Sequence, residues 1–192
     1  MAESIGFYGD RFWPVLLLGL PLLSIDVVSL HRSVAVQTLV AWAFGPFVCA
    51  AFVRACNLVL RARWSWTAFA VALIVYLPFP ALLRLYVLPG VAWFGLIGLA
   101  VPAALAERVG VRAALKRGLQ LGRADLAHAI GGLATLCIVY GLSRGVLLVL
   151  LHTQGDQAQK IALSLSDLVL SPLIFVGGAL LYVDQAARAE VE

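Results

Sequence analysis

The chain has 192 residues, of which 62% are hydrophobic and only 12% are charged, and its mean hydropathy is +0.98. Soluble domains are about half apolar and about one quarter charged, so this composition excludes an ordinary water-soluble protein and indicates a membrane protein. The formal net charge of +4 does not indicate a nucleic-acid partner, because no soluble module is long enough to carry a basic binding face.

Charged and turn-forming residues divide the apolar sequence into six segments, each about long enough to cross a bilayer as a helix. The predicted spans are residues 13–30, 34–60, 64–83, 86–106, 126–151 and 161–183. The acidic start MAESIGFYGD does not fit a cleavable signal peptide, so we expect the first apolar run to be retained. The predicted fold is all-α: residues 1–192 form a single polytopic domain, an integral membrane bundle of six transmembrane helices.

Pro89, Gly90 and Pro102 mark the fourth span. Proline lacks an N–H and glycine accepts unusual dihedrals, so we expect Pro89 and Gly90 to break or start the helix and Pro102 to kink it. Such a kink serves packing, which is the simpler explanation, or exposes carbonyls to a ligand.

Residues 107–125, between the fourth and fifth spans, are predicted to form an amphipathic helix at the cytoplasmic interface. Arg108, Arg112, Lys116, Gln120 and Arg123 recur every three or four residues and would share one helical face. Basic side chains on such a face suit contact with anionic lipid head groups. A solvated connector without specific lipid contact explains the same pattern equally well.

Gly118 and Gly122 also lie in this segment, at a spacing that lets a neighbouring helix approach closely.

Charged residues also fall within the predicted spans. Arg144 lies eight residues before His152, and Asp167 lies seven residues after Lys160 at the other end of the same loop. Both are therefore about 10 Å from the loop, on antiparallel helices that are expected to be neighbours. We predict an Arg144–Asp167 ion pair, as a clamp between helices or as the polar lining of a cavity, with separate snorkelling of the two side chains as the alternative. Asp26, about one turn from the external end of its span, is interpreted as interfacial.

The basic residues indicate the orientation of the bundle. With a cytoplasmic N-terminus, ten of the 14 Lys and Arg residues fall on the cytoplasmic side. This asymmetry follows the positive-inside rule, and six spans return both termini to the cytoplasm.

Several motifs resemble a broad family of prokaryotic polytopic membrane proteins that includes the membrane domain of some glycerophosphodiester phosphodiesterases. They are PG at 89–90, AVP at 100–102, AALKR at 113–117 and SPLIFVGGALLYVDQAAR at 171–188. The chain departs from the family at Gly118, where Ser is common, and at Ala186, near which Arg is common. The resemblance implies a six-helix bundle in the inner membrane of a prokaryotic cell, without the phosphodiesterase chemistry, which belongs to a separate soluble domain.

Enzymatic signatures are absent from the sequence. No glycine-rich phosphate loop, HExxH or GxSxG motif occurs, and the three cysteines lack a paired spacing, so no catalytic residue, metal site or cofactor is predicted. We predict a non-enzymatic scaffold or partner subunit that contacts membrane lipids and another membrane protein. A transporter or lipid-handling protein is the alternative, and it would bring polar residues together at a midplane cavity.

Overall fold

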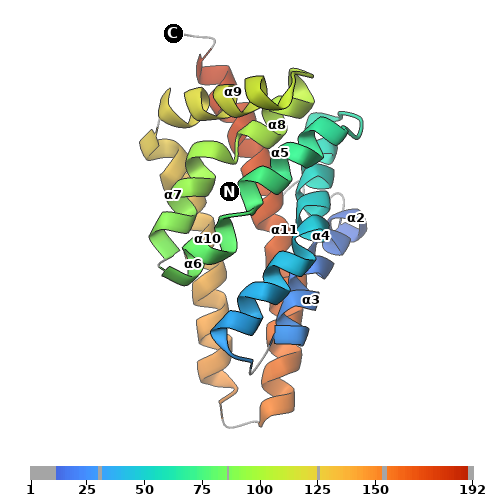
Figure 1. Ribbon diagram of the computed structural model, residues 1–192. Helices are drawn as coiled ribbons and strands as arrows, with labels where there is room; N and C mark the ends of the chain where they lie inside the picture. The colour runs from blue at the N-terminus through green and yellow to red at the C-terminus, as the bar shows by residue number, and fades with distance from the viewer. Residues whose placement is uncertain (1–11, 30–31, 86, 125, 153–154, 190–192) are drawn as a thin grey trace.

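The computed structural model describes residues 12–29, 32–85, 87–124, 126–152 and 155–189, and within these ranges it contains helices and no strands. The elements in chain order are α2 (Phe12–Leu16), the 3₁₀ helix η1 (Leu17–Gly19), α3 (Leu20–Ser29), α4 (Val34–Leu60), α5 (Trp66–Tyr76), α6 (Phe79–Leu85), α7 (Val87–Ile97), α8 (Ala100–Ala106), α9 (Val111–Ala124), α10 (Leu126–Leu150) and α11 (Asp156–Ala189). They form an elongated bundle with α9 lying across one end and the α10–α11 hairpin projecting at the other (Figure 1).

Within the described residues, five helical segments are long and apolar enough to cross a membrane. They are Val34–Leu60, Trp66–Leu83, Leu88–Ala106, Ile130–Leu150 and Lys160–Arg188. The apolar segment Trp13–Ser29 is shorter. The chain is therefore an all-helical, multi-pass membrane bundle by length and composition. The expected boundaries at residues 30, 86 and 125 lie outside the described residues.

Prolines interrupt the helices of the first and fourth apolar segments. Each interruption lies about one turn before the proline that causes it. In a regular helix the carbonyl of Gly98 would accept the N–H of residue 102, but Pro102 has none, and Gly98 accepts from Val101 at 3.3 Å instead. The same change of hydrogen-bond partner occurs before Pro21, where the Leu17 carbonyl accepts the N–H of Leu20. The interruption expected near Pro102 is thus a break between α7 and α8 at residues 98–99.

Pro89 and Gly90 lie in the first turn of α7, and the helix continues without interruption to Ile97. Proline is tolerated in a first turn because the N–H groups there have no partner within the helix. Of the two roles expected for this pair, the structure shows a helix start and no kink at these residues.

A second proline break separates α5 from α6, because neither Pro78 nor Pro80 has an N–H to continue the helix. Two tryptophans donate to carbonyls beside this break. Trp93 Nε1 donates to the Val75 carbonyl at 2.9 Å, and Trp42 Nε1 donates to the Leu77 carbonyl at 2.9 Å. Unpaired backbone groups in hydrocarbon are costly, so these indole N–H groups stabilise the two carbonyls beside the break.

Helix α9 packs directly on the α7–α8 break. A Cβ atom on Gly118 would lie 2.6 Å from the Ala100 Cα, and one on Gly122 would lie 2.6 Å from the Leu96 carbonyl oxygen. Both glycines are buried, so the close helix approach expected from their spacing is confirmed. Only glycine at these two positions allows α9 to lie this close to the broken helix.

The expected helix 107–125 begins later than predicted, at Val111. Arg108 has a φ of 51°, in the left-handed region, and belongs to the turn between α8 and α9. The prediction that Arg108 shares a helical face with Arg112, Lys116 and Arg123 is therefore wrong for Arg108. The other three side chains are exposed on α9.

Candidate functional site

The charged residues inside the bundle gather into one cluster that joins α3, α10 and α11. Arg144 on α10 forms ion pairs with Asp26 on α3, through Nη2 and Oδ2, and with Asp167 on α11, through Nη1 and Oδ1. The pair expected from the sequence, Arg144 with Asp167, is thus present in the structure. The sequence did not predict that Asp26 joins it.

Tyr140 completes the cluster. Its hydroxyl accepts from Arg144 Nη1 at 2.7 Å and donates to Asp167 Oδ1 at 2.5 Å. Tyr140 precedes Arg144 by four residues, so the two side chains lie one above the other on the same face of α10. That spacing is a sequence signal that could have identified Tyr140 as a member of the site.

Helix packing explains why this cluster is enclosed. Helix α11 packs against α3, α4 and α10, and the side chain of Asp167 is 0% exposed. Arg144 and Asp26 retain 22% and 26% of their side-chain exposure. The Ser171 hydroxyl donates to the Asp167 backbone carbonyl at 2.5 Å, one turn further along α11. A buried carboxylate requires hydrogen-bonded or oppositely charged partners, because desolvation without them costs several kcal/mol, and Tyr140 and Arg144 supply them to Asp167.

The partners of Asp167 are unevenly divided between its two carboxyl oxygens. Oδ1 receives Tyr140 and Arg144, whereas the buried Oδ2 has no hydrogen-bond partner within the part of the chain that the structure describes. An unpartnered buried oxygen on a carboxyl group indicates that a proton or another donor belongs there.

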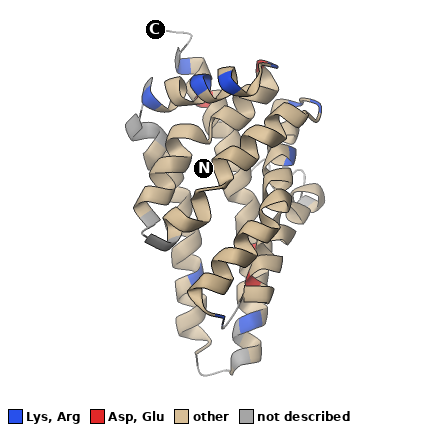
Figure 2. Ribbon diagram, in the orientation of Figure 1, with Lys and Arg blue, Asp and Glu red and all other residues tan. Residues whose placement is uncertain are grey.

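The cluster lies in the half of the bundle away from the basic end. Arg144 is six residues from the end of α10 at Leu150, and the α10–α11 connection follows directly. Most Lys and Arg residues instead gather around α9, at the opposite end (Figure 2).

A separate ion pair holds α9 at that basic end. Arg117 Nε donates to Glu107 Oε1 at 2.9 Å, and the Tyr182 hydroxyl on α11 lies 3.4 Å from the same oxygen. These contacts link the middle of α9 to the end of α8, and the end of α8 to α11. Arg117 is therefore paired with Glu107, while the exposed basic side chains of α9 face away from the bundle.

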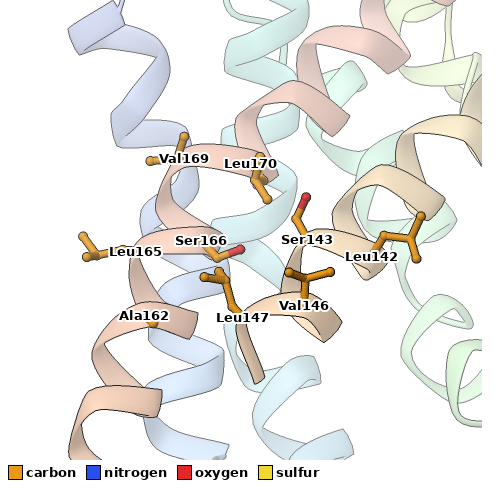
Figure 3. A pocket seen from close by; sticks show the side chains of 9 residues that line it. All are labelled: Leu142, Ser143, Val146, Leu147, Ala162, Leu165, Ser166, Val169 and Leu170. Carbon is orange, nitrogen blue, oxygen red and sulfur yellow. The ribbon is translucent and has the colours of Figure 1, made fainter. Parts of the chain in front are cut away.

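An apolar groove of about 700 Å³ runs between α10 and α11 (Figure 3). Its lining is Leu142, Ser143, Val146 and Leu147 from α10 and Ala162, Leu165, Ser166, Val169 and Leu170 from α11. The Ser166 hydroxyl points between the two helices, is buried and has no hydrogen-bond partner among the described residues (Figure 3). Such a groove suits an acyl chain better than a polar solute, because its walls are almost entirely hydrocarbon.

No group of three or more His, Cys, Asp or Glu residues that could hold a metal ion occurs in the described ranges. The cluster couples a guanidinium, a phenol and two carboxyl groups, which can hold helices together and can bind a proton. Comparisons of the chain with family models, with curated proteins and with solved structures found no match. The family resemblance of the sequence therefore remains a prediction.

Proposed function

We propose that this chain is a non-enzymatic integral membrane protein that acts as a scaffold or partner subunit, with α10 as the contact for another membrane protein. The observation that carries the proposal is that the rest of the chain buries very little of α10. In the membrane-length segment Ile130–Leu150 only 6% is buried, compared with 61% in Leu88–Ala106 and 50% in Lys160–Arg188.

The surface of α10 has the form that helix–helix contacts in membranes use. Gly141 and Gly145 are one turn apart, and a Cβ atom on either would meet nothing within 4 Å. They border a shallow depression that Val146 and Val149 flank. Small residues beside apolar side chains allow two backbones to approach closely, which is the main source of helix association in lipid.

Photo-cross-linking in native membranes tests this proposal. A photoreactive residue at Val146, 54% exposed on α10, should give a protein adduct, while one at Ile74, 47% exposed on α5, should label lipid alone. Gly141→Leu should abolish the adduct without lowering stability, because the added side chain meets only open space in the isolated chain. Lipid labelling alone at both positions would contradict the scaffold.

The groove between α10 and α11 favours a second candidate, a lipid-handling protein. Its volume and apolar lining match one acyl chain, and Ser143 and Ser166 are its polar lining residues. Mass spectrometry of lipids retained through purification distinguishes the two candidates. One tightly held lipid per chain, lost in Val146→Trp, supports lipid handling, whereas a stoichiometric protein partner supports the scaffold.

We also propose six spans with both termini in the cytoplasm, as the resemblance to the prokaryotic family implies. The segment Trp13–Ser29 would reach about 26 Å as a helix, which is near the lower limit for crossing a bilayer. The gathering of basic residues at the α9 end supports placing that end in the cytoplasm (Figure 2). Trp66, 75% exposed near the same end, fits the aromatic belt of an interface.

The exposed basic side chains at the α9 end are proposed to contact anionic lipid head groups. Arg112, Lys116 and Arg123 project from α9, and Arg108 projects from the preceding turn. Each charge contributes about 1 kcal/mol near an anionic surface. Replacing these four residues by Gln should reduce the anionic lipid that copurifies with the protein, whereas a Gln at the paired Arg117 should reduce it less. Equal retention in all variants would favour a solvated connector.

A further inference from the structure

The intramembrane cluster contains one positive group and two acids. Arg144 is always charged, so ionisation of both Asp26 and Asp167 would leave a net charge of −1 inside the bundle. An uncompensated charge in a low-dielectric interior is strongly unfavourable. Neutrality requires one further positive charge at the cluster, and a proton on one carboxyl group is the smallest that can supply it.

Contacts of the two acids indicate where that proton lies. Arg144 binds Asp26 through Nη2 and Asp167 through Nη1, so the two carboxyl groups lie on the two terminal nitrogens of one guanidinium. Two ionised carboxylates have only acceptor atoms, so a donor between them requires that one carries a proton. Asp167 Oδ2 is fully buried and has no hydrogen-bond partner among the described residues. Both Asp167 oxygens are satisfied only when this proton is present.

We propose that Asp26, Tyr140, Arg144 and Asp167 form a proton-binding site, in which one proton is shared between the carboxyl groups of Asp26 and Asp167. Binding converts one carboxylate into a carboxylic acid and changes the net charge of the cluster from −1 to 0. Tyr140 keeps its own proton in this arrangement, since its hydroxyl donates to Asp167 Oδ1 while it accepts from Arg144. The site is separate from the exposed surface of α10, so it does not depend on the scaffold function.

The elements packed against α11 supply no other charge to this site. Helix α4 carries the exposed Arg54 and the buried thiols of Cys49 and Cys56, and η1 and α8 carry no titratable side chain. Helix α9 meets α11 at the opposite end of the bundle (Figure 1). On α3 the titratable side chain is Asp26, and on α10 the free thiol of Cys137 precedes the cluster members Tyr140 and Arg144.

A metal cation fits the site less well than a proton. Arg144 contacts both acids and presents a fixed positive charge, which would repel a cation at the same position. The third acidic, histidine or cysteine ligand that a metal would use is absent from the described residues around the cluster.

Infrared spectroscopy of the purified full-length protein in lipid tests the proposal directly. The carbonyl band of a protonated carboxylic acid should be present at neutral pH and should disappear in both Asp26→Asn and Asp167→Asn. Asp184→Asn, at an exposed Asp on the same helix α11, should leave the band unchanged. Absence of the band from the wild-type protein at neutral pH would overturn the proposal, even if no variant folds.

Stability measurements give an independent readout. Asparagine resembles a protonated carboxyl group, so either single variant should keep a neutral cluster and unfold at a detergent concentration close to that of Asp184→Asn. The double variant leaves Arg144 without a counter-charge and should be clearly less stable than either single variant. A large loss in each single variant would indicate an ordinary ion pair with no proton and would overturn the proposal.

The pH dependence of unfolding also tests whether the folded protein holds this proton. Unfolding releases the shared proton to water, so the unfolding equilibrium constant of the wild-type protein should rise with pH by up to about tenfold per unit while the folded state holds the proton. Asp167→Asn should remove this slope. Dependence on sodium concentration with no dependence on pH would assign the site to a cation and contradict a proton.

Discussion

Gly118 on α9 is the position where the structure predicts the clearest effect of adding a single methyl group. In Gly118→Ala the new Cβ would lie 2.6 Å from the Ala100 Cα, whereas apolar carbon atoms pack at about 3.5–4.0 Å. The helices would have to separate by about 1 Å along a contact made by backbone atoms, which cannot change rotamer. The buried side chains of Ala114 and Leu121, on the same face of α9, would lose contacts as a result.

Two opposing effects set the magnitude for Gly118→Ala. Replacing glycine by alanine in a helix contributes about 1 kcal/mol of stability, while overpacking of this kind costs about 1–3 kcal/mol. Because the clash involves backbone, the cost belongs in the upper part of that range, and the net loss should be about 1–2 kcal/mol. The Ser that is common here in the resembled family carries the same Cβ and should be similarly unfavourable in this chain.

Gly131→Ala provides the matched control, because Gly131 is also helical and a Cβ there would meet nothing within 4 Å. Unfolding by a denaturing detergent in mixed micelles, followed by circular dichroism, measures both variants. Gly131→Ala should be as stable as the wild-type protein or more stable, and Gly118→Ala should be less stable. If Gly118→Ala were as stable as Gly131→Ala, α9 would not lie against the α7–α8 break.

Three further outcomes are expected. If both termini are cytoplasmic, as proposed, a cysteine at Gly155 in a cysteine-free background should react with a membrane-impermeant reagent from outside the cell, and one at Lys116 only after the membrane is permeabilised. Tyr140→Phe should lower the unfolding free energy by about 1 kcal/mol, since the guanidinium and carboxylate still contact each other without the hydroxyl. Trp93→Phe removes the donor to the Val75 carbonyl, and thermal unfolding should report a loss of about 1–2 kcal/mol.

The positions of most helices could be predicted because charged residues and prolines separate the apolar segments of the sequence. The segment 34–60 matches α4 in full, and the interruptions within the predicted third and fourth spans come from a local rule. A proline removes the hydrogen bond to the carbonyl four residues earlier, so Pro102 predicts a break at Gly98. The break therefore lies one turn before Pro102, the residue at which the kink was expected.

The site could be predicted only where chain geometry constrains it. Arg144 and Asp167 lie at equal depth on two helices joined by a short loop, so their contact follows from helix rise alone. Asp26 belongs to α3, and its contact with Arg144 depends on how α3 packs against α11, for which the sequence contains no local signal. Residues distant in the chain meet through tertiary packing, and this is why one acid was predicted and the other was not.

Two acids hold Arg144 inside the bundle, and a double-variant cycle with Asp167 tests this most directly. Removing one member of a buried charged pair leaves its partner uncompensated and costs about 3–5 kcal/mol, so Arg144→Gln should be strongly destabilising. Adding Asp167→Asn to that variant removes one uncompensated acid, and the double variant should recover part of the loss in detergent unfolding. A double variant as unstable as the sum of the two single variants would show that Arg144 and Asp167 do not interact.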